Sequence, residues 1–243
     1  MAEADFQVLL GSLSTSSVAR GVTAGVSKPN GGGSFVYGFN SLAIVDGAAA
    51  LACGLTNFYP TLSGGSIRGA LMRGAGGGNT DFAPFLFIGL NGNNVSNSGY
   101  LLGLGDADPY HIILRKGSIV TGLPDLVPDP DGAEHVLMRS TETYEIDKWL
   151  QLRLDMIVQG SGDVILQCYQ NDLDTNPVTA PVWELIPGML GPLYPGITGF
   201  VDDALGVNTG SVPYTAGRMG FAFRVEDAVR RVYVDAIECS RQI

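Results

Sequence analysis

The sequence has few basic residues and no long apolar run, and each scarcity excludes a class of protein. Its 243 residues include 14 Lys and Arg against 24 Asp and Glu, which gives a net charge of −10. A chain with this charge and no cluster of lysines or arginines repels phosphate backbones, so we expect no nucleic-acid partner. No apolar run approaches the roughly 20 residues that a membrane helix needs, so we expect no membrane insertion.

Cysteines are few, and we expect no secretion signal at the start of the chain. Residues 1–6 are acidic where a signal peptide is basic, which predicts synthesis in a cytoplasm without secretion. Cys53, Cys168 and Cys239 are odd in number and form no Cys-x-x-Cys pair. In a reducing compartment such residues are free thiols, so we predict neither a disulfide framework nor a cysteine metal site.

Signatures of catalysis and of cofactor binding are also missing. The two histidines, His111 and His135, do not have the spacing of zinc ligands, and no Gly-x-Ser-x-Gly motif occurs. We therefore predict no cofactor and no metal. One acidic loop leaves calcium binding open, although its spacing differs from that of a calcium-binding loop: Asp125, Asp129, Asp131 and Glu134.

What the sequence has in abundance is apolar residues at every second position. Apolar residues occupy every second position from Leu150 to Val158, and Gln151, Arg153 and Asp155 lie between them, which is the period of a half-buried strand. Residues 159–162 can reverse the chain, and Val164, Leu166 and Cys168 repeat the alternation. This pattern predicts an antiparallel β-hairpin, onto which the remaining segments pack.

Similar short segments occur throughout the chain, separated by turn residues. The 34 glycines and 13 prolines are spread along the sequence, which is typical of many turns between short strands. We predict an all-β sandwich of two antiparallel sheets, formed by residues 35–243. Residues 1–34 are a Ser- and Gly-rich extension that is either disordered or ordered against the sandwich or a neighbouring subunit. The expected strands are Phe35–Phe39, the segment Leu42–Leu55 with a turn at Asp46 and Gly47, Ile67–Gly74, Phe82–Leu90, Tyr100–Leu104, His111–Gly117, Gly217–Val225 and Arg231–Cys239.

The C-terminal part of the chain, from about residue 100, resembles a known family. Residues 149–155 with 163–166, then 217–223 and 232–237, are similar to the concanavalin A-like jelly roll of legume lectins, laminin-G-like modules and laminarinase-like enzymes. Glu145 and Asp147 resemble the start of the Glu-x-Asp-x-Glu strand of those enzymes, but Trp149 replaces the second glutamate. Because a retaining glycosidase needs both carboxylates, we predict that the protein is not an enzyme.

The whole chain also resembles structural proteins of tailed bacteriophages. The similar stretches are residues 35–41, 65–70, 81–87, 100–104 and 108–117. This resemblance implies a non-enzymatic virion component of the tail, baseplate or capsid surface, assembled in the bacterial cytoplasm. Its partners would be other virion proteins and further copies of itself. The position in the particle, the copy number and the symmetry stay open.

A lectin-like module that contacts host-surface glycans is the alternative function, and a glycoside hydrolase is a less favoured third. A glycan site needs exposed aromatic rings beside polar loop residues. The candidate contacts are Tyr110, Trp183 and Tyr194, each of which equally suits packing in the core or in a loop. Trp183 belongs to a long proline-rich segment, residues 172–214, and long loops on a rigid sandwich often carry binding residues.

Overall fold

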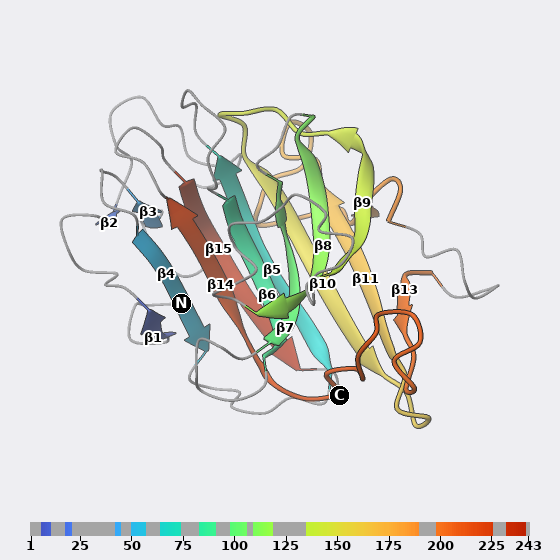
Figure 1. The fold of residues 1–243 in the computed structure, drawn as a ribbon. Coiled ribbons are helices and arrows are strands. Elements are labelled where there is room, and N and C mark those ends of the chain that lie inside the picture. Colours follow the sequence, from blue (N-terminus) through green and yellow to red (C-terminus); the bar gives the residue numbers. More distant parts are fainter. Residues whose placement is uncertain are drawn as a thin grey trace.

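The protein is a β-sandwich in its computed structural model (Figure 1). The structure describes residues 6–10, 18–20, 42–44, 50–56, 64–73, 83–90, 98–105, 109–118, 135–189, 198–225 and 232–241. None of these residues is helical, so the described part of the chain contains no helix that could span a membrane. The predicted strand Phe35–Phe39 and the acidic loop Asp125–Glu134 lie outside the described residues.

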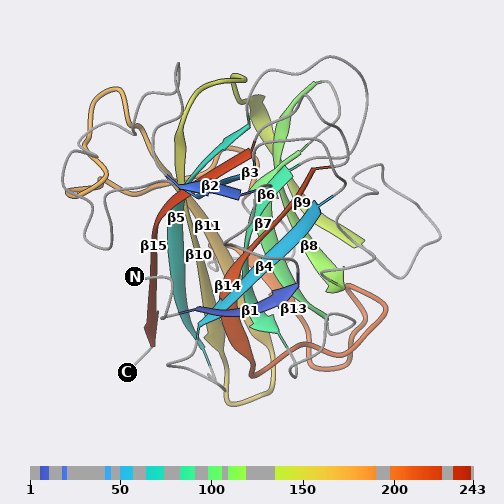
Figure 2. The same ribbon diagram turned by 90° about the vertical axis from the view of Figure 1, so that its left-hand side faces the viewer.

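Two antiparallel sheets form the two layers of the sandwich, which confirms the predicted all-β architecture. In order across the sheet, sheet A contains β1 (Phe6–Leu10), β4 (Ala50–Thr56), β14 (Arg218–Val225), β6 (Ala83–Leu90), β7 (Ser98–Leu104), β8 (His111–Ser118) and β9 (His135–Thr143). Sheet B contains β12 (Glu184–Leu185), β11 (Val164–Asn171), β10 (Leu150–Val158), β5 (Gly65–Arg73), β15 (Val232–Arg241), β3 (Leu42–Ile44) and β2 (Val18–Arg20), with β13 (Phe200–Asp202) also paired to β11. In Figure 2, β15 and β5 of sheet B lie to the left of β4 and β8 of sheet A.

The predicted hairpin is present as β10 and β11. Leu154 pairs with Cys168, and Val158 pairs with Val164 next to the turn. Two backbone hydrogen bonds close this turn, from Gln159 N to Asp163 O and from Gly162 N to Gln159 O, each 2.9 Å long. Gly162 has a φ of 93°, a conformation that glycine adopts without a steric penalty.

The core lies between the sheets and consists of the apolar members of the alternating strands. Because side chains alternate across a strand, the polar residues between these positions on β10 and β5 must point away from the core. Burying each large aliphatic side chain contributes about 1.5–3 kcal/mol, and this core holds the two layers together. Its fully buried members include Ile67, Leu71, Leu152, Leu154, Met156 and Leu166 from sheet B and Leu86, Ile88, Leu102, Leu104 and Leu114 from sheet A.

Strand β9 is absent from the sequence-based expectation because its core-facing positions are not uniformly apolar. Ser140 is 4% exposed and occupies one of them. Its hydroxyl accepts a hydrogen bond from Ile112 N at 2.9 Å and donates one to Glu142 O at 2.5 Å, so its burial leaves no polar atom without a partner. The strand lies at the edge of sheet A, where a polar sequence is tolerated.

Two segments of the first 34 residues are edge strands of the sandwich. Strand β1 pairs with β4 in sheet A, and β2 pairs with β3 in sheet B. These segments therefore lie against the sandwich, which is one of the two arrangements left open by the sequence. The division of the chain at residue 34 stays a prediction.

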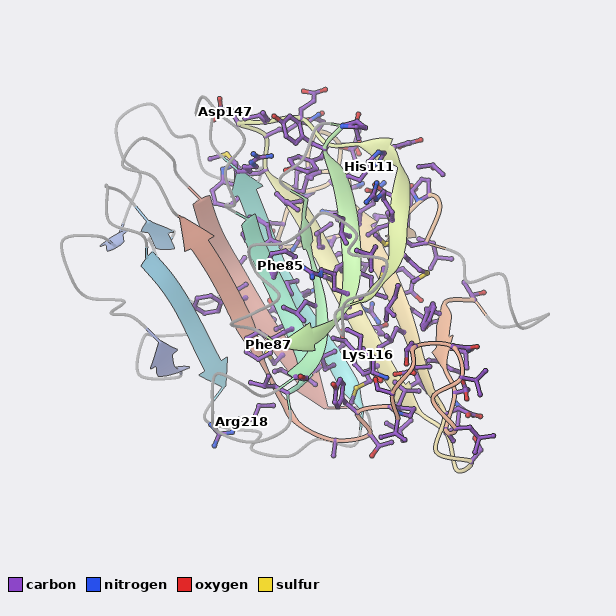
Figure 3. All side chains as sticks on the ribbon, in the orientation of Figure 1. Phe85, Phe87, His111, Lys116, Asp147 and Arg218 are labelled. Carbon is purple, nitrogen blue, oxygen red and sulfur yellow. The ribbon has the colours of Figure 1, made fainter. Side chains whose placement is uncertain are left out.

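A buried ionic network fastens residues 200–214 to sheet A. Lys116 of β8 is labelled in Figure 3, and its Nζ lies 2.6 Å from Oδ2 of Asp202 in β13. The two side chains are 2% and 0% exposed. Thr209 accepts a hydrogen bond from Lys116 and donates one to Asp202, at 2.7 and 2.8 Å. The Tyr100 hydroxyl donates to Asp202 at 2.5 Å, and burial is the main reason why the pKa of Tyr100 is raised. The network leaves neither buried charge without a partner.

Candidate functional site

The outer face of sheet B carries a row of charged and aromatic residues across four strands. Arg153 of β10 pairs with Arg68 of β5 on one side and with Tyr169 of β11 on the other. Arg68 in turn pairs with Glu238 of β15. These positions alternate with the buried core residues of the same strands, so their side chains share the face that points away from sheet A.

A second polar row lies beside the first. Asp155 is two residues beyond Arg153 on β10, and its neighbours are Ser66 on β5 and Gln167 on β11. Ser240 on β15 pairs with Ser66. Since residues two apart on a strand share a face, the two rows form one continuous polar surface.

A cavity of about 290 Å³ opens on this surface. It is near the lower end of the range, roughly 300–1,000 Å³, that is usual for small-ligand sites. Most of its wall comes from the two rows, and Trp183, in the segment that follows β11, closes one side. The lining residues are Ser66, Arg68, Arg153, Trp183, Glu238, Cys239 and Ser240.

Each arginine of the cavity is paired with its own carboxylate. Arg68 donates from Nε to Glu238 Oε2 at 2.8 Å and also from Nη2 to the same oxygen. Arg153 donates from Nε to Asp155 Oδ1 at 2.7 Å and from Nη2 to Asp155 Oδ2 at 2.5 Å. The hydrogen bond to Asp155 raises the pKa of Arg153 above its ordinary value. Two like charges side by side on neighbouring strands destabilise a sheet, and these pairs remove that repulsion.

Two aromatic rings border the Arg153 guanidinium. Its central carbon lies 5.1 Å from the centre of the Tyr169 ring and 5.9 Å from that of Trp183, within the range of a cation–π contact. The Tyr169 hydroxyl donates to Gln167 Oε1 at 3.1 Å. Partial burial, followed by the charge of Asp155, raises the pKa of Tyr169, so this hydroxyl keeps its proton at neutral pH.

Polar side chains under the 172–183 segment determine where Trp183 lies. Asn171 is 1% exposed and accepts a hydrogen bond from Val182 N at 2.9 Å through Oδ1. Its Nδ2 donates to Gln151 Oε1 at 2.8 Å, and Gln151 Nε2 donates to Val178 O at 3.1 Å. Buried amides of this kind fix a backbone because each unmade hydrogen bond would cost about 1–3 kcal/mol.

A small apolar cluster fastens the same segment to sheet B. Leu173 and Val178 pack with Trp149 against Ala70 and Met72, and all five side chains are at most 6% exposed. This cluster is separate from the core between the sheets. The segment is therefore held by apolar contacts and hydrogen bonds, and Trp183 follows directly at its end.

Of the three residues predicted to contact a glycan, one lies in the wall of the cavity. Trp183 is half-buried in the cavity wall, on the outer face and not in the core. Tyr110 is not among the residues that line the cavity: its ring lies 5.7 Å from that of Tyr144 and 4.4 Å from the Arg73 guanidinium. Tyr194 lies outside the described residues. Roles for Tyr110 and Tyr194 in glycan binding stay predictions.

The residues that resemble a glycosidase motif do not lie on a strand. Glu145 and Asp147 are exposed in the turn between β9 and β10, and Asp147 has a φ of 62°. Asp147 appears at the upper end of the molecule in Figure 3, while Trp149 is 6% exposed in the apolar cluster beneath residues 172–183. The alternation of carboxylates along one strand face, on which the motif depends, does not occur here.

Cysteines and clustered acids offer no second site among the residues that the structure describes. Cys168 and Cys239 are free thiols, and burial raises the pKa of Cys239 to about 12, which keeps the thiol protonated. No group of three or more His, Cys, Asp or Glu in the described ranges could hold a metal ion.

Comparisons with known proteins identify the fold. No protein-family model matches the chain, and no curated protein matches it. The carbohydrate-binding module CBM66 from Bacillus subtilis matches over 99% of this chain and 98% of its own, with a TM-score of 0.51 and 12% identity. The potassium-bound carbohydrate recognition domain of Emp46p matches over 99% and 90%, with a TM-score of 0.51 and 9% identity. The predicted concanavalin A-like jelly roll is confirmed, and identities this low show the fold alone.

Proposed function

We propose that this protein is a carbohydrate-binding module and that the cavity on the outer face of sheet B is its binding site. The observation that carries the proposal is a half-buried indole, Trp183, beside two arginines, their carboxylates and two serine hydroxyls. A sugar ring has apolar C–H faces and a rim of hydroxyl groups. An aromatic ring packs against such a face, and nearby polar groups hydrogen-bond to the rim.

The polar groups of the cavity include both donors and acceptors, as hydroxyl recognition requires. A guanidinium has five N–H groups, and Arg68 and Arg153 each use two of them for their carboxylates. The remaining N–H groups are donors for a sugar oxygen. Both hydrogen bonds from Arg68 go to Glu238 Oε2, so Glu238 Oε1 is an acceptor for a sugar O–H. The hydroxyls of Ser66 and Ser240 are further acceptors.

The comparisons support this proposal over a purely structural role. Both reported neighbours are named as carbohydrate-binding domains, and neither is named as an enzyme. Nothing in the comparisons supports a virion component, so the phage location, the virion partners and self-association stay predictions. If the chain belongs to a phage particle, the proposed ligands are the glycans of the host surface.

Replacing the indole tests the proposal. We expect Trp183→Ala to weaken binding of an oligosaccharide found on a glycan array by at least about tenfold, equivalent to about 1.4 kcal/mol. Isothermal titration measures this loss. Val182→Ala is the matched control, because Val182 is the preceding residue, is 53% exposed and does not line the cavity.

Two results would refute the proposal. The first is an array on which the folded protein retains no saccharide. The second is a titration in which Trp183→Ala binds as tightly as the unmodified chain.

A further inference from the structure

The charges around the cavity indicate which saccharides it accepts. We propose that the site binds neutral saccharides and discriminates against those that carry a carboxylate, such as uronic acids. The inference rests on the proposed carbohydrate-binding function and goes beyond it by naming a ligand class.

The formal charges of the site cancel. Of the described residues that line the cavity, Arg68 and Arg153 are the only cations, and each is hydrogen-bonded to one carboxylate. The four side chains are 12–33% exposed, so their pairs are partly shielded from water. No uncompensated positive charge therefore remains to attract an anionic sugar.

The geometry of the pairs also occupies one of the two edges of each guanidinium that can bind a carboxylate. Arginine recognises carboxylates best through two parallel N–H groups on one edge of the guanidinium. In Arg153 both N–H groups of the Nε–Nη2 edge are taken by Asp155. In Arg68 the Nε–Nη2 edge is taken by Glu238. The remaining N–H groups, on the Nη1–Nη2 edge, suit hydroxyl oxygens because the charge of each guanidinium is already compensated by its own carboxylate.

A ligand carboxylate would also meet like charges. Any position within reach of the free N–H groups is close to Glu238 or Asp155, because each carboxylate is bonded to the same guanidinium. The net charge of the whole chain, −10, acts in the same direction. A neutral sugar avoids this repulsion and can donate its hydroxyl protons to the same carboxylates.

This arrangement predicts how specificity changes when one carboxylate is neutralised. Glu238→Gln leaves Arg68 as an uncompensated cation beside Arg153, its cross-strand neighbour. Asp155→Asn does the same for Arg153. Both changes keep the size and most of the hydrogen-bonding capacity of the side chain, and both should raise the affinity for acidic sugars.

The experiment compares matched oligosaccharides that differ only in charge, such as oligogalactosides and oligogalacturonides, at about 50 and 500 mM NaCl. We expect the neutral member of a pair to bind at least about tenfold more tightly, with less than about a twofold change between the two salt concentrations. Glu238→Gln and Asp155→Asn should each improve binding of the uronide at least about threefold. Trp183→Ala should weaken binding of either member by at least about tenfold.

The outcomes separate the inference from the function on which it rests. Preferential binding of uronides that requires Trp183 overturns the inference and leaves the proposed function intact. Binding that does not require Trp183, or no binding of any saccharide, overturns the proposed function and the inference with it. Circular dichroism checks the fold of each variant, and the salt dependence of the unmodified chain tests the inference even where a variant does not fold.

Discussion

Replacing Lys116 with methionine should destabilise the protein strongly, because it leaves a buried carboxylate without its counterion. Methionine has nearly the shape of lysine, so the main change is the loss of charge. Asp202 is 0% exposed and keeps hydrogen bonds from Tyr100 and Thr209. Removing one partner of a buried ion pair costs about 3–5 kcal/mol. For a chain of this size, about 1 kcal/mol corresponds to about 2–4 °C, which gives a lower melting temperature by roughly 6–20 °C.

Calorimetry of three variants at neutral pH measures this cost. Lys148→Met is the matched control, because Lys148 forms a pair of the same length, 2.6 Å, with Asp174, but the two side chains are 38% and 66% exposed. Exposed pairs contribute about 0–1 kcal/mol, so the control should melt within a few degrees of the unmodified protein. The double variant Lys116→Met with Asp202→Asn should be more stable than Lys116→Met alone, since no unpaired charge remains.

The reasoning would be refuted if Lys116→Met and Lys148→Met lowered the melting temperature equally. It would also be refuted if the double variant were the least stable of the three. Either result would mean that an unpaired buried charge at Asp202 is not the cause of the lost stability.

The remaining predictions concern the two segments that follow β11 and β13. Asn171→Ala should lower the free energy of unfolding by about 1–3 kcal/mol, measured in urea, because it leaves Val182 N and Gln151 without their partner. It should also weaken saccharide binding, since Trp183 follows Val182. Hydrogen bonds from backbone amides lower the pKa of Asp203 below its ordinary value of 3.8, and the bond from the Asn208 amide has the largest effect. The stability they contribute is present above pH 3.8 and is lost as the pH falls through the lowered pKa, so Asp203→Asn should flatten the pH dependence of melting below about pH 4.

The hairpin and the orientation of its residues could be predicted from sequence because both depend on local alternation. Gln151, Arg153 and Asp155 occupy the gaps between apolar residues, and the structure places them on the face opposite the core. Trp183 could be singled out as an aromatic residue in a long loop. Each of these features is decided by residues that are close in the chain.

The site itself could not be predicted, because its members come from distant parts of the chain. Arg68 and Glu238 are 170 residues apart and become neighbours only through the pairing of β5 with β15. No local pattern states which strands pair, since register across a sheet depends on the whole set of strands. The available signal for Arg153 and Tyr169 was their position between the apolar residues of alternating strands, which places such residues on one outer face.

The two tryptophans provide the most direct test of the central claim, which is that Trp183 lies in a saccharide site. Trp149 lies beneath the 172–183 segment at 6% exposure, and Trp183 is half-buried in the cavity wall. The measurement is a titration with a neutral oligosaccharide that follows the two indole N–H signals by NMR, assigned with Trp183→Phe. A shift of the Trp183 signal that saturates while the Trp149 signal stays in place is the expected result. A shift of the Trp149 signal alone, or of neither signal while the saccharide binds, would contradict the account.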